Sequence, residues 1–299
     1  MSRKKLAVII LIAIIAVVVA VVIHEQTQPP IADGQVVTFS DPNLEAAIRE
    51  ALDHPEGDIR ASQLAELTSL SAPEREIEDL SGLEHCHNLT LLSLRSNLIS
   101  DISPLADLTG LTHLGLGDNQ IADLSLIAGF TNLTRLELAD SGIRDISLLV
   151  GLTKLEWLEL GSNNISDISP LAGLTGLTWL YLRNNLIDDI SPLADLTNLA
   201  ELELGDNQIS DISPLAELTA LTWLELDGNQ ISDISAVANL TELKRLYLQS
   251  NQIADISALV GNVGLGEGDF IDLGDNPLSE ESVNTMVPQL EARDVYVYW

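Results

Sequence analysis

Three of the four tryptophans in this 299-residue sequence recur at multiples of one interval, and two of its four tyrosines follow the same interval. Trp157, Trp179 and Trp223 are separated by 22 and 44 residues, and Tyr181 and Tyr247 are separated by 66. An exposed indole or phenol ring supplies a broad apolar surface with one polar group, which is the usual composition of a protein-binding hot spot. The chemistry that this pattern favours is non-covalent recognition of a partner.

A second set with the 22-residue interval consists of aspartates, namely Asp101, Asp123, Asp145, Asp167, Asp189, Asp211, Asp233 and Asp255. Carboxylates about 5 Å apart repel each other by about 0.8 kcal/mol in water, and a series of calcium ions would relieve that repulsion. A calcium site needs several oxygens that converge on one point, however, and one aspartate per interval does not supply them. We therefore expect each aspartate to bond the backbone of its own turn and to face solvent.

The sequence HCH at residues 85–87 has the residue types of a metal site, but the repeat alignment favours another explanation for its cysteine. Cys86 takes the position of Leu108 and Leu174, which predicts a buried core residue. No nucleophile elbow, phosphate loop, zinc pair or cofactor fingerprint is present. We expect no metal, no cofactor and no enzymatic activity, and a single cysteine excludes an internal disulfide.

The charge of the chain limits the class of partner. Forty-five acidic and fourteen basic side chains give a formal net charge of −31. Three of the basic residues are Arg3, Lys4 and Lys5, so the chain beyond them is more acidic still. Such a surface repels nucleic acid and anionic lipid headgroups. We therefore exclude DNA and RNA as partners.

The first 23 residues have the pattern of a membrane segment. After the three basic residues, Leu6 to Ile23 are all apolar, and at about 1.5 Å per residue they span about 27 Å as a helix. The positive flank predicts an uncleaved single-pass anchor with the N-terminus inside and the rest outside. The alternative is a signal peptide that is cleaved before secretion, although its apolar run is long and no A-x-A site follows. Either interpretation places the rest of the chain outside the cytoplasm.

Asparagines reveal the repeat that must position all of these residues. Seven fall on one 22-residue grid, namely Asn97, Asn119, Asn163, Asn185, Asn207, Asn229 and Asn251. Around each one the chain follows L-x-x-L-x-L-x-x-N-x-I-x-D-I-S-P-L-A-x-L-T, with residues 155–176 as a complete copy. Ser141 fills the one missing place, and Asn276 in the last copy is displaced three residues from the grid.

A single copy of this repeat cannot fold alone. Burial of its seven aliphatic side chains contributes roughly 10–20 kcal/mol, whereas ordering twenty-two residues costs about 30 kcal/mol. Stacking of neighbouring copies must supply the difference. We expect the asparagine amide to bond backbone groups that the turn leaves unpaired, and Ser147 and Ser169 to cap short helices. Ser141 lacks the amide, which predicts a local weak point.

This repeat resembles the leucine-rich repeats of bacterial surface proteins, specifically those of the 22-residue internalin type. The resemblance implies an α/β fold, a right-handed solenoid with a curved parallel sheet on its concave face and short helical turns on its convex face. It also implies that a partner protein binds the concave face. In this sequence no immunoglobulin-like joining domain or wall-sorting tail follows the repeats, so we do not extend the resemblance to invasion of host cells.

The predicted organisation has five parts. Residues 1–23 form the anchor or signal segment, 24–38 a polar tether, 39–66 an N-terminal helical cap, 67–278 the solenoid and 279–299 a C-terminal cap. In the first cap, Ser40 or Asp41 precedes an amphipathic helix that extends to residue 52. In the second, Ser279 caps a helix through Ala292, and a final strand places Val295 and Val297 in the core.

The predicted binding residues occupy strand positions six and four before each asparagine, which point away from the core because strand side chains alternate. At these positions they are Trp157, Trp179, Trp223, Tyr181, Tyr247, Glu159, Glu201, Glu203, Glu225, Arg135 and Arg245. Arg183, which lies outside these two positions, is also predicted to bind. The rings would anchor a partner, the glutamates favour one with a basic and partly apolar surface, and the arginines fix its register. The competing interpretation is that the rings only shield the sheet or fill a tight concavity.

Together these patterns predict a membrane-anchored, extracytoplasmic recognition module that binds a protein through its concave aromatic and acidic face. One alternative is a structural envelope protein without a specific ligand, whose acidity suits a salty medium. Another is a surface protein that binds glycans or peptides, because flat rings also stack on sugars.

Overall fold

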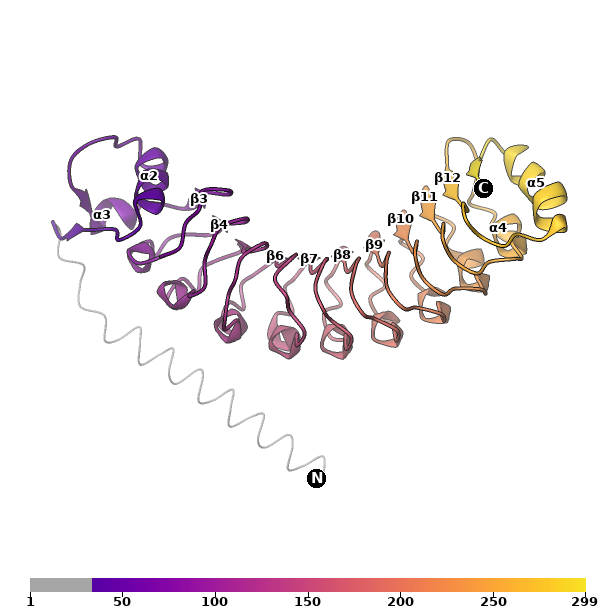
Figure 1. Cartoon of the computed structure of the whole chain (residues 1–299), viewed down its shortest axis with the longest axis horizontal. Helices are drawn as coiled ribbons and strands as arrows, with labels where there is room; N and C mark the ends of the chain where they lie inside the picture. Colours follow the sequence, from indigo (N-terminus) through magenta and orange to yellow (C-terminus); the bar gives the residue numbers. More distant parts are fainter. Residues whose placement is uncertain (1–33) are drawn as a thin grey trace, which may run out of the picture.

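The computed structural model describes residues 34–299, and in it the strands form one long curved sheet. Eleven parallel strands follow in the order β13 to β3, while β1 and β2 form a separate antiparallel pair. Figure 1 shows an arc with the strands on its inner side and the short helical turns on its outer side. This arrangement confirms the predicted solenoid. The predicted anchor, and the predicted tether up to residue 33, lie outside the described residues.

Each repeat contributes one three-residue strand and one short turn. The strands are β3 (Ser69–Ser71), β4 (Leu91–Ser93), β5 (His113–Gly115), β6 (Arg135–Glu137), β7 (Trp157–Glu159), β8 (Trp179–Tyr181), β9 (Glu201–Glu203), β10 (Trp223–Glu225), β11 (Arg245–Tyr247), β12 (Phe270–Asp272) and β13 (Tyr296–Tyr298). The turns are η1 (Leu83–His85), η2 (Ser103–Leu105), η3 (Ser125–Gly129), η4 (Ser147–Gly151), η5 (Ser169–Leu171), η6 (Ser191–Leu193), η7 (Ser213–Leu215), η8 (Ser235–Asn239) and α4 (Ser257–Gly261).

The repeated aliphatic side chains fill the space between the sheet and the turns. Leu158, Leu160 and Ile165 are fully buried, as are their counterparts in neighbouring repeats. Cys86 is also fully buried, which confirms the core position predicted for it. Burial, with a smaller contribution from Glu84, raises the pKa of its thiol to about 12. The thiol is therefore neutral and inert at physiological pH.

A ladder of buried asparagine amides joins each repeat to the one before it. The Nδ2 of Asn163 donates to the carbonyls of Leu138 and Leu160, both at 2.9 Å, and its Oδ1 accepts from the N–H of Ile143 at 2.9 Å. Asn276 makes the same contacts, including 2.8 Å to the carbonyl of Leu248, despite its displacement from the grid. Each amide thus satisfies backbone groups of two repeats, which confirms the role predicted for it.

The ladder is interrupted at Ser141, where the sequence predicts a weak point. The Ser141 hydroxyl donates only to the carbonyl of Ala139, at 3.1 Å. Within residues 34–299, the N–H of Ile121 has no acceptor equivalent to the amide oxygen that serves Ile143. Ile121 and Leu124 are half-buried here, whereas the corresponding isoleucines of the flanking repeats are buried. This repeat therefore packs less tightly than its neighbours.

The prediction that serines cap the outer turns is wrong. Ser147 and Ser169 are the first residues of η4 and η5, and no side chain of the preceding residue makes a cap bond. Instead Asp145 and Asp167, two residues earlier, accept the serine N–H groups at 2.8 Å. A carboxylate two residues before a turn reaches that donor without strain, as in an Asx-turn.

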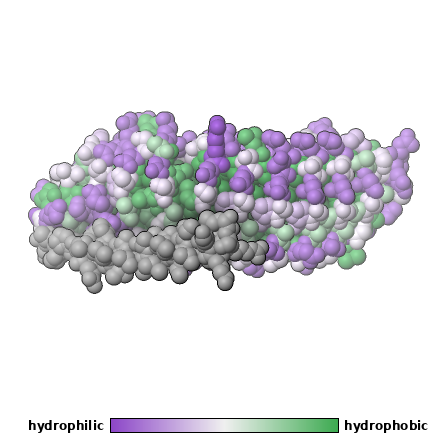
Figure 2. Space-filling model, turned by 90° about the horizontal axis from the view of Figure 1, so that it is seen from below, coloured by the Kyte–Doolittle hydropathy of each residue, from purple (hydrophilic) through white to green (hydrophobic). Residues whose placement is uncertain are grey.

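These bonds confirm the solvent-facing backbone role that the sequence predicts for the aspartates. The pKa of Asp145 lies below its ordinary value because the backbone N–H and the hydroxyl of Ser147 donate to it. The same cause lowers the pKa of Asp123, Asp189 and Asp211. Figure 2 views the outer side of the arc and shows hydrophilic residues repeated across its uncovered right-hand part.

Two helices and a strand pair lie at the N-terminal end. Helix α2 (Pro42–Ala51) packs against β3, and α3 (Ala61–Leu64) follows β2 (Ile59–Arg60). The Asp41 carboxylate accepts from Leu44 N at 3.1 Å in α2 and from Glu78 N at 2.7 Å, so it links the helix to the first repeat. Strand β1 (Val36–Val37), which falls in the predicted tether, pairs with β2, and its Val37 is buried.

The C-terminal end has a helix with a wide turn, η9 (Ser282–Met286), which continues as α5 (Val287–Glu291). The Ser279 hydroxyl accepts from the N–H of Ser282 at 3.1 Å, as the sequence predicts for a cap. Val295 is buried, whereas Val297 in β13 is only half-buried, so the predicted core position of Val297 is wrong in part. It lies in the last strand, which has a neighbour on one side alone. No helix within residues 34–299 is long and apolar enough to cross a membrane.

We predict that Ser141→Asn stabilises the protein, because the asparagine restores the repeat consensus; Gly142 is kept, because its φ of 67° would strain another side chain. Two or three regained hydrogen bonds correspond to about 1–3 kcal/mol. Denaturant unfolding of the full chain measures the change. The matched variant Asn163→Ser should lose a similar amount, and an unchanged midpoint in both variants would refute the role assigned to the ladder.

Candidate functional site

The register of the sheet places the predicted binding residues in two rows on the inner side of the arc. Trp157 pairs with Trp179, and Glu159 with Tyr181, in parallel register. The leucine between them in each strand is fully buried, so the flanking side chains point to the opposite, concave side. The same register continues through β9, β10 and β11. Arg183 follows β8 and joins this surface through Glu225.

The first cluster of rings consists of Trp157, Trp179 and Tyr181. The centroid of the Trp157 ring lies 5.4 Å from that of Trp179 and 4.9 Å from that of Tyr181. The guanidinium of Arg135 lies over the Trp157 ring at 4.0 Å, a cation–π contact, and also pairs with Glu137. These contacts form one packed unit across β6, β7 and β8.

The second cluster of rings consists of Trp223, Tyr247 and Phe270. The ring centroids are 5.6 Å apart for Trp223 and Tyr247 and 5.4 Å apart for Tyr247 and Phe270. Arg245 lies over the Trp223 ring at 4.9 Å. Sequence reasoning missed Phe270 because three extra residues shift the last copy off the 22-residue grid. Counting six residues back from Asn276 would have found it.

All five predicted rings are half-buried, whereas the sequence predicts freely exposed rings. Their neighbours explain the difference, because each ring packs against another ring or an arginine. The ring planes within each cluster are inclined by 36° to 49°. The clusters therefore present uneven apolar surfaces whose side chains are already held in place.

An acidic strip, which consists of Glu201, Glu203 and Glu225, separates the two clusters. Glu201 accepts a hydrogen bond from the hydroxyl of Tyr181 at 3.0 Å, and Glu225 accepts one from Trp223 Nε1 at 2.9 Å. Between them, the Glu203 side chain has no hydrogen bond within the described residues. Burial, and then the charge of Glu225, raises the pKa of Glu203 to about 7, with Arg183 opposing the shift.

A hollow of about 390 Å³ lies beside the first cluster, on the side of the asparagine turns. Its lining includes Trp157, Tyr181, Glu159, Glu203 and Arg183, together with Arg95, which sequence reasoning missed because it precedes the aromatic repeats. Burial and the nearby charge of Glu137 raise the pKa of Glu159. The Nε1 of Trp157 is buried and has no partner within residues 34–299. The hollow thus combines flat apolar walls with two carboxylates, those of Glu159 and Glu203, that form no ion pair within residues 34–299, although Arg95 and Arg183 line the same space.

The arrangement suits binding of a cationic and apolar surface. A partner's lysine or arginine would pair with Glu159 and Glu203 while its aliphatic stem packs on the rings. Among residues 34–299, no group of three or more histidine, cysteine, aspartate or glutamate side chains is placed to hold a metal ion.

Comparisons with known proteins support the leucine-rich-repeat fold. The family model described as "Leucine Rich repeats (2 copies)" matches residues 131–173, 153–193, 175–217 and 219–261. The crystal structure of an internalin (inlF) from Listeria monocytogenes is 33% identical, with a TM-score of 0.60; the match covers 87% of this chain and 91% of that one. Internalin C2 (inlC2) from the same organism is 38% identical, with a TM-score of 0.67 and coverage of 70% and 97%.

A leucine-rich-repeat protein of Leptospira interrogans is 25% identical, with a TM-score of 0.73; the match covers 80% of this chain and 62% of that one. A search of curated proteins gives no match. These three structures are bacterial repeat proteins with the same fold, and the two internalins share 33% and 38% of the aligned residues with this chain.

We predict that Glu203→Gln stabilises the protein at pH 8 and has little effect at pH 4. A carboxyl whose pKa is raised from 4.5 to about 7 in the folded state is neutral and favourable below pH 4.5. That contribution is lost as the pH rises through 7. For this half-buried group we expect a gain of about 1 kcal/mol after solvent screening, or about 2–4 °C in Tm.

Thermal unfolding of the full chain at both pH values measures this effect. Glu217→Gln is the control, because Glu217 is exposed and lies outside the concave rows, so its substitution should not raise the Tm. Equal shifts for Glu203→Gln at pH 4 and pH 8 would contradict the assignment.

Proposed function

This chain belongs to the internalin-type leucine-rich-repeat proteins of bacteria, and on that basis we propose that its concave face binds a protein partner. The leucine-rich-repeat fold is typical of protein-interaction modules, whose curved sheet supplies an extended binding surface. The observation that carries the proposal is the pair of ring clusters on β7–β8 and β10–β12, each with an arginine stacked on a tryptophan. The activity that we propose is recognition without catalysis.

The charges of this face define the partner's chemistry. Glu159, Glu201, Glu203 and Glu225 lie on or between the clusters, and two of them have raised pKa values because burial disfavours their charged form. A basic group on the partner would stabilise those charges, so binding should release a proton from Glu203 near neutral pH. Tyr247 and Trp223 would contact the apolar part of the partner. Arg135, Arg183 and Arg245 interrupt the negative field and would fix the register.

The packing of the rings favours a protein over a glycan. Sugar rings stack on an open, flat aromatic face, whereas the inclined rings of both clusters cover part of one another's faces. Rings that are already held by neighbours lose little conformational entropy on binding, which favours their use as anchors. The same ordering speaks against a purely structural envelope role, because a structural surface has no need for two preorganised apolar clusters in an acidic face.

Internalin-like repeat proteins are surface or secreted proteins, and we propose the same location for the repeats of this chain. In our proposal residues 1–23 anchor the chain in the membrane with the repeats outside. Cleavage after this segment would instead release a secreted protein. The support is the apolar run that follows Arg3, Lys4 and Lys5.

We predict that Trp179→Ala together with Trp223→Ala abolishes capture of the partner. Hot-spot tryptophans contribute about 2 kcal/mol or more each, so loss of both weakens binding on the order of a thousandfold. Affinity capture with the full chain, followed by mass spectrometry, compares the double variant with wild type. Val150→Ala is the control, because Val150 is exposed on the outer turn η4.

The Tm of each variant must be measured alongside, because both rings are half-buried. A double variant that remains folded and captures the same proteins as wild type would exclude the concave rings as the binding site. Equal loss in Val150→Ala would point to the outer side instead.

A further inference from the structure

The long sheet ends at its C-terminal edge in a strand with exposed aromatic side chains. Tyr296 is 68% exposed, Tyr298 64% and Trp299 54%. Strand β13 is the last strand of the sheet and pairs with β12 alone. Its two tyrosines continue the concave rows through Phe270 and Asp272.

The backbone of β13 offers unpaired hydrogen-bonding groups at this edge. Tyr296 N–H donates to the carbonyl of Asp269 at 2.8 Å, and the carbonyl of Tyr298 accepts from Leu273 N–H at 2.7 Å. Alternate residues of a parallel strand point their backbone groups to opposite sides. The N–H and C=O of Val297 therefore point away from β12, to a side with no neighbouring strand among the described residues. Such groups are a template for another strand.

The sequence of β13 does not protect this edge. Proteins usually block an edge strand with a charge, a proline or a bulge, whereas VYVYW at residues 295–299 contains neither charge nor proline and consists of strong strand formers. At the opposite edge, β3 has serines at the corresponding positions, and helix α2 packs against it. The two ends of the sheet are thus unequal.

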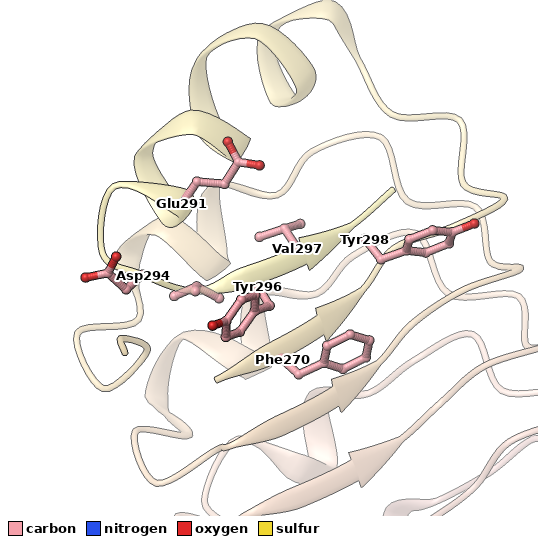
Figure 3. A pocket seen from close by; sticks show the side chains of 7 residues that line it. Phe270, Glu291, Asp294, Tyr296, Val297 and Tyr298 are labelled. Carbon is pink, nitrogen blue, oxygen red and sulfur yellow. The ribbon is translucent and has the colours of Figure 1, made fainter. Parts of the chain in front are cut away.

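An acidic groove of about 420 Å³ follows β13, lined by Phe270, Glu291, Asp294, Val295, Tyr296, Val297 and Tyr298. Figure 3 shows Glu291, from α5, and Val297 on one side of the strand, with Tyr296 and Phe270 on the other. The guanidinium of nearby Arg293 is already bound to the carbonyls of Asn262 and Val260. Among the residues that line the groove, Glu291 and Asp294 are the charged ones, and Arg293 is not part of the lining.

We propose that an extended segment of a partner protein, with basic and apolar residues in alternation, adds to the open edge of β13. Its backbone would pair with Val297, and its side chains would alternate between the two sides of the sheet. On the helix side, lysine stems would pack on Val297 while their ammonium groups reach Glu291 and Asp294. On the concave side, apolar residues would pack against Tyr296 and Tyr298.

A second copy of this chain fits the edge less well. An antiparallel pair of β13 strands would bring two sets of Glu291 and Asp294 together, and each copy has a net charge of −31. Like charges across an interface oppose association. The inference is independent of the function proposed for the concave ring clusters, since the groove contains no residue of those clusters except Phe270.

Hydrogen–deuterium exchange of the full chain tests this proposal with the synthetic peptides KVKVK and EVEVE as probes. We expect KVKVK to slow exchange in residues 295–299 about tenfold at ten times its Kd, and EVEVE to have no effect. Glu291→Lys combined with Asp294→Asn should reverse the preference. Both side chains are exposed, and asparagine tolerates the positive φ of 61° at position 294.

A KVKVK peptide with N-methylated valines tests the strand pairing, because it keeps the charge but loses backbone donors, and it should not protect residues 295–299. The proposal is overturned if neither peptide protects this segment or if both protect it equally. Equal protection by the N-methylated peptide would also overturn it. Protection that rises with protein concentration, without peptide, would identify a second copy as the occupant instead.

Discussion

The structure depends on one repeated interaction, the buried asparagine amide that bonds the backbone of two successive repeats. A solenoid has no long-range contacts that could correct a misplaced turn, so the alignment of each repeat rests on contacts with its neighbours. Asn163 donates to carbonyls of its own repeat and of the preceding repeat, and accepts from Ile143. Aliphatic burial supplies stability without direction, whereas these bonds fix the turn that follows each strand and so align each repeat with the one before it.

Because the repeats are aligned in this way, side chains that recur every 22 residues form two rows on the concave side. Because Trp157 lies beside Trp179 in the sheet, their rings meet at 5.4 Å, and the glutamates of the next row fall next to Tyr181. The pKa values of carboxylates shift in opposite directions on the two sides of the arc. On the outer side, serine donors lower the pKa of Asp145, while on the concave side burial raises the pKa of Glu203 to about 7. The negative charge is thus stabilised at Asp145 on the outer side and disfavoured at Glu203 on the concave side.

The sequence predicts the repeat, the core and the concave rows because all three follow from a strict period. It fails where an interaction is not periodic. Phe270 lies outside the 22-residue grid after an insertion, and Arg95, which lines the hollow, precedes the aromatic repeats that drew attention to this face. The choice of Asp145 rather than Ser147 as the cap depends on the local turn geometry. The half-burial of the rings depends on how neighbouring side chains pack, which the alternation of residue types does not specify.

The exchange rates of the isoleucine amides test the central role of the ladder most directly. Hydrogen exchange followed by NMR should show slow exchange for Ile99, Ile143, Ile165, Ile187 and Ile209, whose N–H groups donate to asparagine oxygens. Ile121, opposite Ser141, should exchange faster by about fivefold, as the loss of one hydrogen bond of about 1 kcal/mol implies. Equal protection at Ile121, or fast exchange at all of these amides, would contradict the account.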